Sequence, residues 1–393
     1  MPSSAPAGAP LDLSTLTYEA LSEDPYPIFA RLRAESPIVH VPDLDEWYIT
    51  RWDDCAQLGA ISDDVAPGRQ ADEDFFGAPN ILRLDGAAHK ALRMGIDTRI
   101  RPRAISSYVD TAIRPIVAEY VARIRPQGKA DLTTELFEQI SVRIVGNQLG
   151  MKDVDDETLV RWFQVLSSGH ATRDGAEADV LVEIEAYLRN KIAAVTAEAD
   201  DSIISHMVHV GQDDPRTYDE LAPTLRVIIL GGFQEPGHAV ANAFYGLFTR
   251  PEQLAELVAD PEKYAGAAFN EGLRWLSPVS GISRTTRREV TIRDVTIPAN
   301  SSLTVLIAAA NRDPEQFEDP DSYDMHRMLQ AHAAFGFGEH FCSGNFLARQ
   351  LGQIMIEEVV RTLPGLRPDP DLPSEVSGYG FRAATHLPAL WNI

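Results

Sequence analysis

A short stretch near the C-terminal end, AFGFGEHFCSGNFLARQ at residues 334–350, constrains the chain more than any other part of its sequence. It places one of the two cysteines of the chain, Cys342, close to Phe335, Phe337 and Phe341, a histidine and several glycines. Gly336, Gly338 and Gly344 permit tight turns and a close approach of the backbone to a neighbouring group. An amphipathic helix is predicted to follow over Leu347–Val360. The stretch is therefore interpreted as a loop built around a single sulfur atom at the start of a helix.

The surroundings of Cys342 favour a thiolate that binds a metal ion. A glycine-rich loop can aim successive N–H groups at one sulfur, and the following helix points the positive end of its dipole back toward it. The flat side chains of Phe335, Phe337 and Phe341 can shield a large planar ligand. Together these properties predict an axial thiolate ligand to haem iron. Zinc is the competing metal, but no second cysteine or closely spaced histidine pair accompanies Cys342. Cys55 is interpreted as an inert buried thiol.

Composition argues against several classes of function. The chain has 393 residues and a formal net charge of −23, which disfavours nucleic acid or an anionic membrane as its main partner. The N-terminal residues lack the basic and apolar regions of a signal peptide, and no apolar run approaches the length of a membrane span. Two cysteines far apart in sequence rule out a disulfide framework and suit a reducing compartment. We therefore expect a cytoplasmic protein.

The hydrophobic pattern predicts a mainly α-helical fold with a small β region. Apolar residues recur at helical spacing in Ile113–Ile124, Leu159–Leu166, Val180–Ala197, Leu221–Leu247 and Leu347–Val360. Strands are predicted at Ile38–Val41, at Trp47–Thr50 and within Arg288–Asp313, which alternates polar and apolar residues around the turn residues Pro298, Ala299 and Asn300. No linker, repeat or domain boundary is evident. Residues 1–393 are therefore expected to form a single domain, with residues 1–15 as a flexible tail.

The segment FGFGEHFCSG resembles the haem-binding loop of cytochromes P450. It matches every fixed position of that motif, at Phe335, Gly336, Gly338, His340, Cys342 and Gly344. Two further motifs of the family are present: EGLR contains the pair Glu271 and Arg274, and YDMHR supplies Arg327 as the third member of a buried ionic network. The resemblance implies the cytochrome P450 fold, a haem b whose iron is held by the Cys342 thiolate, and O2 as a co-substrate of a monooxygenase.

The family resemblance also implies how the haem propionates are held. HKALR places His89 and Arg93 four residues apart, on one side of a predicted helix. Cytochromes P450 use such a pair to bind the propionates, and His340 and Arg284 are expected to add to it. Two carboxylates at a buried haem edge need cations of this kind. Without the cysteine loop, His89 and Arg93 would be interpreted as an ordinary exposed helix face.

The segment LGGFQEPGHAVANAF, Leu230–Phe244, resembles the central helix that crosses the oxygen-binding face of the haem. The family usually carries a carboxylate followed by threonine there, and the pair delivers protons. Here Glu235 takes the carboxylate position and Pro236 replaces the threonine. Proline inside a helix clashes with the carbonyl four residues earlier, so we expect a kink and an unpaired Gly232 carbonyl. Gln234, Glu235 and Pro236 are therefore predicted catalytic residues, with the first two carrying the proton relay. A plain kink is the alternative.

The motifs QEPGH and GYGFR resemble a narrower group, the bacterial aromatic O-demethylases of the guaiacol type. The group has a small apolar substrate slot, and His170 stands where the guaiacol enzymes carry a third phenylalanine. This position leaves room for a second methoxy group or another ring substituent. The resemblance implies a lignin-derived methoxyphenol, guaiacol- or syringol-like, that is converted to a catechol-type product and formaldehyde. The other positions matching the slot are Phe76, Leu82, Val227, Leu230, Gly231 and Phe381.

The resemblance implies that electrons come from NAD(P)H through a separate flavin or iron–sulfur reductase. The chain itself has no G-x-G-x-x-G unit with which to bind a nicotinamide. Two alternatives remain open. One is a cytochrome P450 that hydroxylates a larger apolar molecule, such as a terpenoid or fatty acid. The other is a non-catalytic haem-thiolate sensor, which the missing threonine favours.

Overall fold

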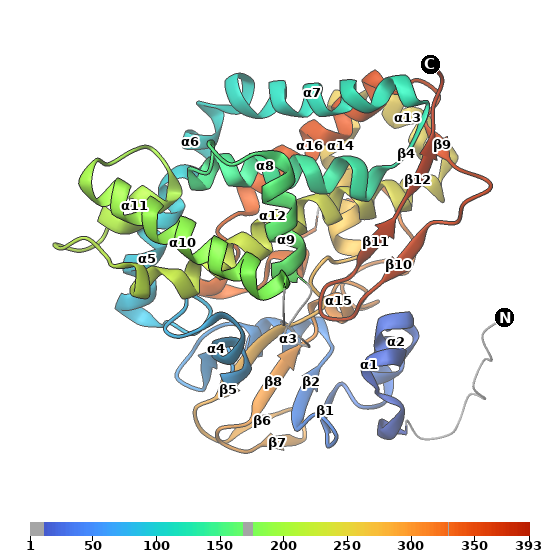
Figure 1. The fold of residues 1–393 in the computed structure, drawn as a ribbon. Coiled ribbons are helices and arrows are strands. Elements are labelled where there is room, and N and C mark those ends of the chain that lie inside the picture. Colours follow the sequence, from blue (N-terminus) through green and yellow to red (C-terminus); the bar gives the residue numbers. More distant parts are fainter. Residues whose placement is uncertain (1–11, 168–175, 329) are drawn as a thin grey trace.

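The computed structural model describes residues 12–167, 176–328 and 330–393. Within these ranges a large body of helices stands on a smaller region built around a five-stranded sheet (Figure 1). Most of the predicted N-terminal tail, residues 1–11, lies outside the described residues. At the end of that tail, Leu13–Thr15 form a short 3-10 turn in which the side chain of Asp12 accepts a hydrogen bond from the amide of Ser14.

Helices make up most of the described chain. They are α1 Tyr18–Glu23, α2 Tyr26–Glu35, α3 Trp52–Gly59, α4 Gln70–Phe76, α5 Gly86–Ile100, α6 Pro102–Ser106, α7 Arg114–Ile124, α8 Glu138–Leu149, α9 Asp156–Ser167, α10 Ala176–Ala197, α11 Ile203–His209, α12 Tyr218–Phe248, α13 Pro251–Ala259, α14 Pro261–Trp275, α15 Ile307–Ala310 and α16 Asn345–Thr362. Two π-helical turns, η2 Val109–Ile113 and η4 Thr133–Phe137, lead into α7 and α8. Each of the five predicted helices is therefore confirmed.

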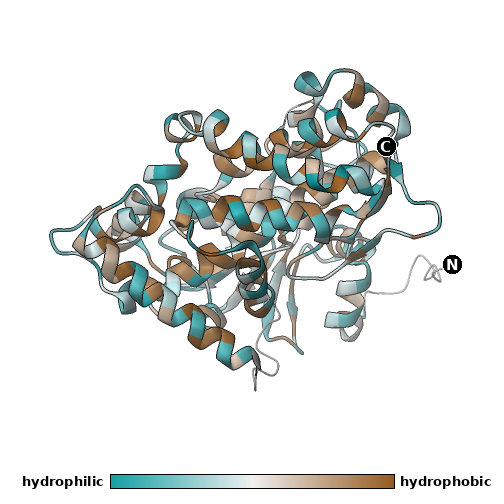
Figure 2. Ribbon diagram, turned by 45° about the horizontal axis from the view of Figure 1, so that its top comes forward, coloured by the Kyte–Doolittle hydropathy of each residue, from teal (hydrophilic) through white to brown (hydrophobic). Residues whose placement is uncertain are grey.

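The long helix α12 forms the centre of the helical body and packs against α8, α14 and α16. It begins with a capping box between Thr217 and Glu220, which satisfies amides that a helix start leaves unpaired. Every residue from Pro236 to Phe244 is buried, as expected for a helix surrounded by others. The surrounding helices carry alternating teal and brown bands, because each buries one face and exposes the other (Figure 2).

Within the described ranges the strands form four small sheets. They are β1 Ile38–Val41, β2 Glu46–Ile49, β3 Val65–Pro67, β4 Lys129–Asp131, β5 Ile282–Thr286, β6 Val290–Ile292, β7 Val295–Ile297, β8 Ser302–Val305, β9 Arg367–Pro368, β10 Glu375–Ser377, β11 Ala383–His386 and β12 Pro388–Leu390. The largest sheet has the order β1-β2-β8-β5-β3, in which only β2 and β8 run parallel. The predicted strands at Ile38–Val41 and Trp47–Thr50 are confirmed as β1 and β2.

The strands predicted within Arg288–Asp313 are confirmed as β6, β7 and β8, the last of which ends at Val305. Ile307–Ala310 instead forms the helix α15, and all four of its residues are buried. Alanine has the highest intrinsic helix propensity, so three successive alanines favour a helical turn over a strand.

Two sequence expectations concern single features of the chain. Among the described residues, no helix combines the length and the apolar character that a membrane crossing requires. Cys55 is fully buried in α3, and its thiol donates a hydrogen bond to the carbonyl of Ile49 at 3.3 Å. Burial raises the pKa of this thiol well above its usual range. These properties confirm that Cys55 is an inert core residue.

Candidate functional site

The loop around Cys342 is held by its own backbone. The amide of Cys342 donates to the carbonyl of Phe335 at 2.9 Å. Gly336 and Gly338 adopt φ angles of 75° and 66°, which other residues adopt only with strain. Helix α16 begins at Asn345, immediately after Gly344, so its positive end faces the sulfur. The sequence prediction of a sulfur at the start of a helix is therefore confirmed.

Cys342 is an exposed residue, although enough protein surrounds its thiol to remove water from part of it. Burial raises the pKa of this thiol. The pKa is lowered in turn by hydrogen bonds from the amides of Gly344 and Asn345 and by the charge of Arg93. The negative charge of Glu235 on α12 also raises this pKa, so α12 and the cysteine loop face one another. An exposed cysteine whose loop faces α12 is open to a group bound between the two.

The space between the loop and α12 suits a flat group. A Cβ atom added to Gly231 would meet no heavy atom within 4 Å, and one added to Gly336 would come no closer than 3.9 Å to its nearest neighbour. Gly232 differs, because its added Cβ would lie 2.7 Å from Val145 of α8. Gly231 therefore leaves open room beside α12, whereas Gly232 lets α8 pack closely. A thiolate on one side and a glycine on the other fit a haem bound between them.

Basic side chains gather at one edge of this space. The rings of His89 and His340 stack with centroids 4.1 Å apart, and Nε2 of each is buried without a partner among the described residues. The Arg93 guanidinium donates to the carbonyl of Phe341 at 2.9 Å. Burial lowers the pKa of Arg284 to about 10. Burial, followed by the charges of His89, Arg284 and Arg93, lowers the pKa of His340 to about 3. Two arginine cations beside two imidazoles that burial keeps neutral, each with an unpaired Nε2, fit a site for anions such as haem propionates.

The predicted ionic network is present at the C-terminal end of α14. Arg274 pairs with Glu271 at 2.6 Å, and both side chains are at most 5% exposed. Arg327 reaches the same carboxylate at 3.2 Å. Arg274 also donates to the carbonyls of Asn311 and Pro320. The network therefore ties α14 to the chain that leads toward the cysteine loop.

Helix α12 continues through Pro236 without interruption. The carbonyl of Gly232, which Pro236 cannot satisfy, accepts a hydrogen bond from the hydroxyl of Ser141 on α8 at 3.2 Å. The expectation of an unpaired carbonyl is therefore wrong, because a neighbouring helix supplies the donor. Beside it, both carboxylate oxygens of Glu235 and Oε1 of Gln234 are buried without partners among the described residues. Burial raises the pKa of Glu235 to about 7, which the charge of His238 partly opposes.

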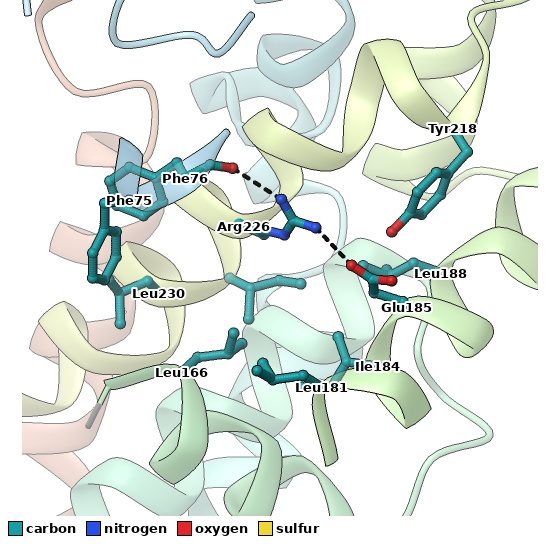
Figure 3. Close-up of a pocket in the computed structure, with 11 residues that line it drawn as sticks. Phe75, Phe76, Leu166, Leu181, Ile184, Glu185, Leu188, Tyr218, Arg226 and Leu230 are labelled. Atoms are coloured by element: carbon teal, nitrogen blue, oxygen red, sulfur yellow. Dashed lines mark hydrogen bonds and ion pairs between the residues drawn. The ribbon is translucent and has the colours of Figure 1, made fainter. Parts of the chain in front are cut away.

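A cavity of about 250 Å³ lies beside α12, between α4, α9 and α10 (Figure 3). Its walls are mainly aromatic and aliphatic, and Arg226 crosses it, donating to the carbonyl of Phe76 at 3.1 Å and to Glu185 at 2.9 Å. Two predicted substrate residues, Phe76 and Leu230, line it. The other lining residues are Phe75, Leu166, Leu181, Ile184, Glu185, Leu188, Tyr218, Arg226 and Ile229.

The remaining predicted substrate positions lie elsewhere. Leu82, Val227, Gly231 and Phe381 do not belong to the wall of this cavity. Phe381 is 42% exposed and forms an isolated bridge with Val279. His170 lies outside the described residues.

The sequence did not lead us to Arg226 as a site residue, although its spacing from Leu230 indicates a position beside the cavity. Arg226 precedes Leu230 by four residues, so the two share one face of α12. A charged residue on that otherwise apolar face marks the polar part of the cavity.

Comparisons with known proteins show what the chain is similar to. A family model described as Cytochrome P450 matches residues 262–366. Cytochrome P450 107B1 of Saccharopolyspora erythraea is 30% identical over 89% of this chain and 90% of its own length. Vitamin D(3) 25-hydroxylase of Pseudonocardia autotrophica is 29% identical over 88% of this chain and 87% of its own length. The ligand-free structure of cytochrome P450 TbtJ1 superposes with a TM-score of 0.84 at 26% identity, covering 95% and 99% of the two chains. The structure of P450BioI superposes with a TM-score of 0.83 at 26% identity, and it covers the same shares of the two chains. That structure is a complex with an acyl carrier protein ligated to hexadec-9Z-enoic acid.

Proposed function

The chain belongs to the cytochrome P450 family of haem-thiolate monooxygenases, and from this premise we propose that it removes the methyl group of a small methoxy-substituted phenol. The products would be a catechol-type phenol and formaldehyde. We also propose that residues 1–393 act as a single domain in which Cys342 binds the iron. In this proposal His89, Arg93, Arg284 and His340 surround the propionates.

The size of the cavity beside α12 carries the proposal. Its volume of about 250 Å³ lies below the range of roughly 300–1,000 Å³ that is typical of sites for drug-sized ligands. A single substituted ring suits such a volume better than a polycyclic or long-chain molecule does. The rings of Phe75 and Phe76 meet edge to face at 4.6 Å on one wall. Aromatic faces of this kind hold another aromatic ring well.

The chemistry divides between the cofactor and the chain. When bound, the haem supplies the activation of O2, and one oxygen atom enters a C–H bond of the methoxy carbon while the other leaves as water. The reaction also consumes two electrons and two protons. The resulting hemiacetal breaks its bond between the phenolic oxygen and the former methyl carbon, and releases formaldehyde. The electrons are proposed to come from NAD(P)H through a separate reductase.

The residues of α12 would position the substrate and supply protons. Leu230 and Phe76 exclude water from one side of the ring. Glu235, whose pKa burial raises to about 7, can hold a proton at neutral pH and release it toward the space that Cys342 borders. A group with a pKa near the working pH is best suited to proton transfer. Gln234 offers a neighbouring amide, so the pair replaces the usual carboxylate and threonine.

A second candidate is the hydroxylation of a larger apolar substrate. The relative from Pseudonocardia autotrophica is named a vitamin D(3) 25-hydroxylase, and P450BioI was crystallised with a hexadecenoic acyl chain. Such molecules are longer than one ring. A cavity that opens further on binding would accommodate them, and Phe381, being 42% exposed, would offer additional apolar surface.

Turnover with a reconstituted reductase separates the two candidates. The haem-loaded protein is incubated with guaiacol, syringol, palmitoleic acid and vitamin D3 in parallel, and formaldehyde is measured against NAD(P)H consumed. Demethylation predicts one formaldehyde for each phenol formed from guaiacol or syringol. Hydroxylated fatty acid or sterol without formaldehyde from any methoxyphenol would favour the second candidate and overturn the first.

A further inference from the structure

A histidine–carboxylate pair joins α12 to α8 on the side of α12 that carries Glu235. Nε2 of His238 lies 3.0 Å from Oε1 of Glu138. The side chain of His238 is 7% exposed and that of Glu138 is 20% exposed, so the pair runs from the interior toward solvent. Glu138 lies outside the sequence motifs that predicted the haem site, and His238 ends the motif QEPGH without having been given a role in it.

The opposite end of His238 is also informative. Its Nδ1 is buried without a partner among the described residues, as are both oxygens of Glu235. Glu235 and His238 are three residues apart on one helix, a spacing that makes side chains neighbours. Burying an unsatisfied polar group costs roughly 1–3 kcal/mol. Two such neighbours within one turn of α12 call for a role beyond packing.

The local backbone brings α8 and α12 close enough for the pair to form. A Cβ added to Gly237 would lie 2.9 Å from the carbonyl of Phe137, the residue before Glu138. The segment that leads into α8, Thr133–Phe137, is a π-helical turn. Single π-helical turns inside helices often occur at functional sites. The glycine and the turn together hold Glu138 against His238.

We propose that Glu138 and His238 conduct protons from solvent to the carboxylate of Glu235. The inference rests on the role of Glu235 in the proposed function, and it adds the route by which that carboxylate is refilled. Glu138 takes a proton from water and passes it to Nε2 of His238. The ring releases its Nδ1 proton to the Glu235 carboxylate, which thereby becomes neutral. Exchange with water, which removes the Nε2 proton and adds one at Nδ1, then restores the first tautomer, and each transfer conserves one proton.

Charges along this path favour the transfer. A protonated His238 stabilises the ionised form of Glu235, and burial favours the neutral form. A Glu235 that has just lost its proton therefore attracts one from the imidazolium. Histidine is the side chain whose charge changes most readily near neutral pH. A purely structural contact between α8 and α12 would need only the bond from Nε2 to Glu138.

Hydrogen–deuterium exchange at the Glu235 carboxyl tests the route without turnover. Ferric, haem-loaded protein is kept in buffer below the pKa of about 7, and its infrared spectrum is compared with that of Glu235→Gln to identify the carboxylic C=O band. Rapid transfer to D2O shifts this band as deuterium arrives. We expect His238→Asn to slow the shift by about 10-fold or more and Glu138→Gln to slow it in the same direction.

The control is another histidine–carboxylate pair, whose histidine lies on a different helix. Nε2 of His206 on α11 is 3.4 Å from Oδ1 of Asp201, so His206→Asn should leave the exchange at Glu235 unchanged. Under turnover with guaiacol, His238→Asn should divert reducing equivalents to peroxide while its substrate-induced spin shift is kept.

Exchange that is unchanged in both His238→Asn and Glu138→Gln would overturn the inference, as would equal slowing in His206→Asn. Glu138→Gln leaves the buried imidazole in place, so it decides the matter if His238→Asn fails to fold. Because the exchange is measured without substrate, its failure would leave the demethylation proposal standing. Formaldehyde yield tests that proposal separately.

Discussion

Replacement of Glu235 by glutamine will stabilise the folded protein at neutral and alkaline pH but not at acidic pH. Burial raises the pKa of Glu235 from 4.5 to about 7, against the opposing charge of His238. An acid whose pKa is higher in the folded state binds its proton more tightly when folded. The free energy of unfolding therefore falls as the pH rises from the pKa of Glu235 in the unfolded chain to its pKa in the folded chain. Above that pH the folded chain must hold a buried negative charge.

The magnitude follows from the two pKa values. The interval from 4.5 to about 7 corresponds to about 3 kcal/mol, since each pKa unit is worth about 1.4 kcal/mol. This penalty is absent below pH 4.5, grows between the two values and is complete above about pH 7. Glutamine resembles the neutral acid in shape, so Glu235→Gln removes the penalty with little change in packing.

Guanidinium unfolding of the haem-loaded protein across this pH range provides the assay. The difference in unfolding free energy between Glu235→Gln and the unmodified protein should rise with pH toward about 3 kcal/mol. Glu183→Gln is a control with the opposite sign. A hydrogen bond from Arg161 lowers the pKa of Glu183. The ionised Glu183 therefore stabilises the folded protein above pH 4.5, and this stabilisation is lost as the pH falls. A Glu235→Gln difference that does not change with pH would refute the reasoning.

Four further predictions concern other residues of the site. Cys342→His will remove the absorption band of thiolate ligation from the reduced, CO-bound protein, whereas Cys55→Ser will keep it; a retained band in Cys342→His would rule out this ligand. Ser141→Ala will lower the free energy of unfolding by about 1 kcal/mol in denaturant titrations, because it leaves the Gly232 carbonyl unpaired; no loss would mean that another donor replaces the hydroxyl. Arg274→Met will lower the same quantity by roughly 3–5 kcal/mol, since Glu271 is buried; a neutral result would show that Arg327 alone satisfies the carboxylate. Phe76→Ala will weaken methoxyphenol binding in spin-state titrations by about 2 kcal/mol, more than Phe381→Ala, while Phe346→Ala, at an exposed position of α16, will not; equal effects of all three would argue against a ring contact at Phe76.

Local sequence patterns predicted the parts of the site that depend on neighbouring residues. The loop around Cys342, the start of α16 and the pair of Glu271 and Arg274 each lie within one short segment, so spacing alone indicates their geometry. The helical period likewise identified α12 as a long buried helix.

Contacts between distant segments were not predictable in this way. Ser141 satisfies Gly232 from a residue 91 positions away, and Glu138 meets His238 from a residue 100 positions away. No local period indicates which helix will pack beside another. The cavity combines α4, α9, α10 and α12 for the same reason, and its polar residues Arg226 and Glu185 became apparent only in the folded chain.

Spin-state titration of the ferric, haem-loaded protein tests the central claim most directly, because it reports ligand entry beside the iron without any reductase. Guaiacol, syringol, palmitoleic acid and vitamin D3 are compared at matched concentrations. A methoxyphenol that enters the cavity beside Leu230 and Phe76 should displace water from the iron and give the largest high-spin fraction, at the lowest concentration. If the fatty acid or the sterol shifts the spectrum while neither methoxyphenol does, the claim that this protein demethylates a small methoxyphenol is contradicted.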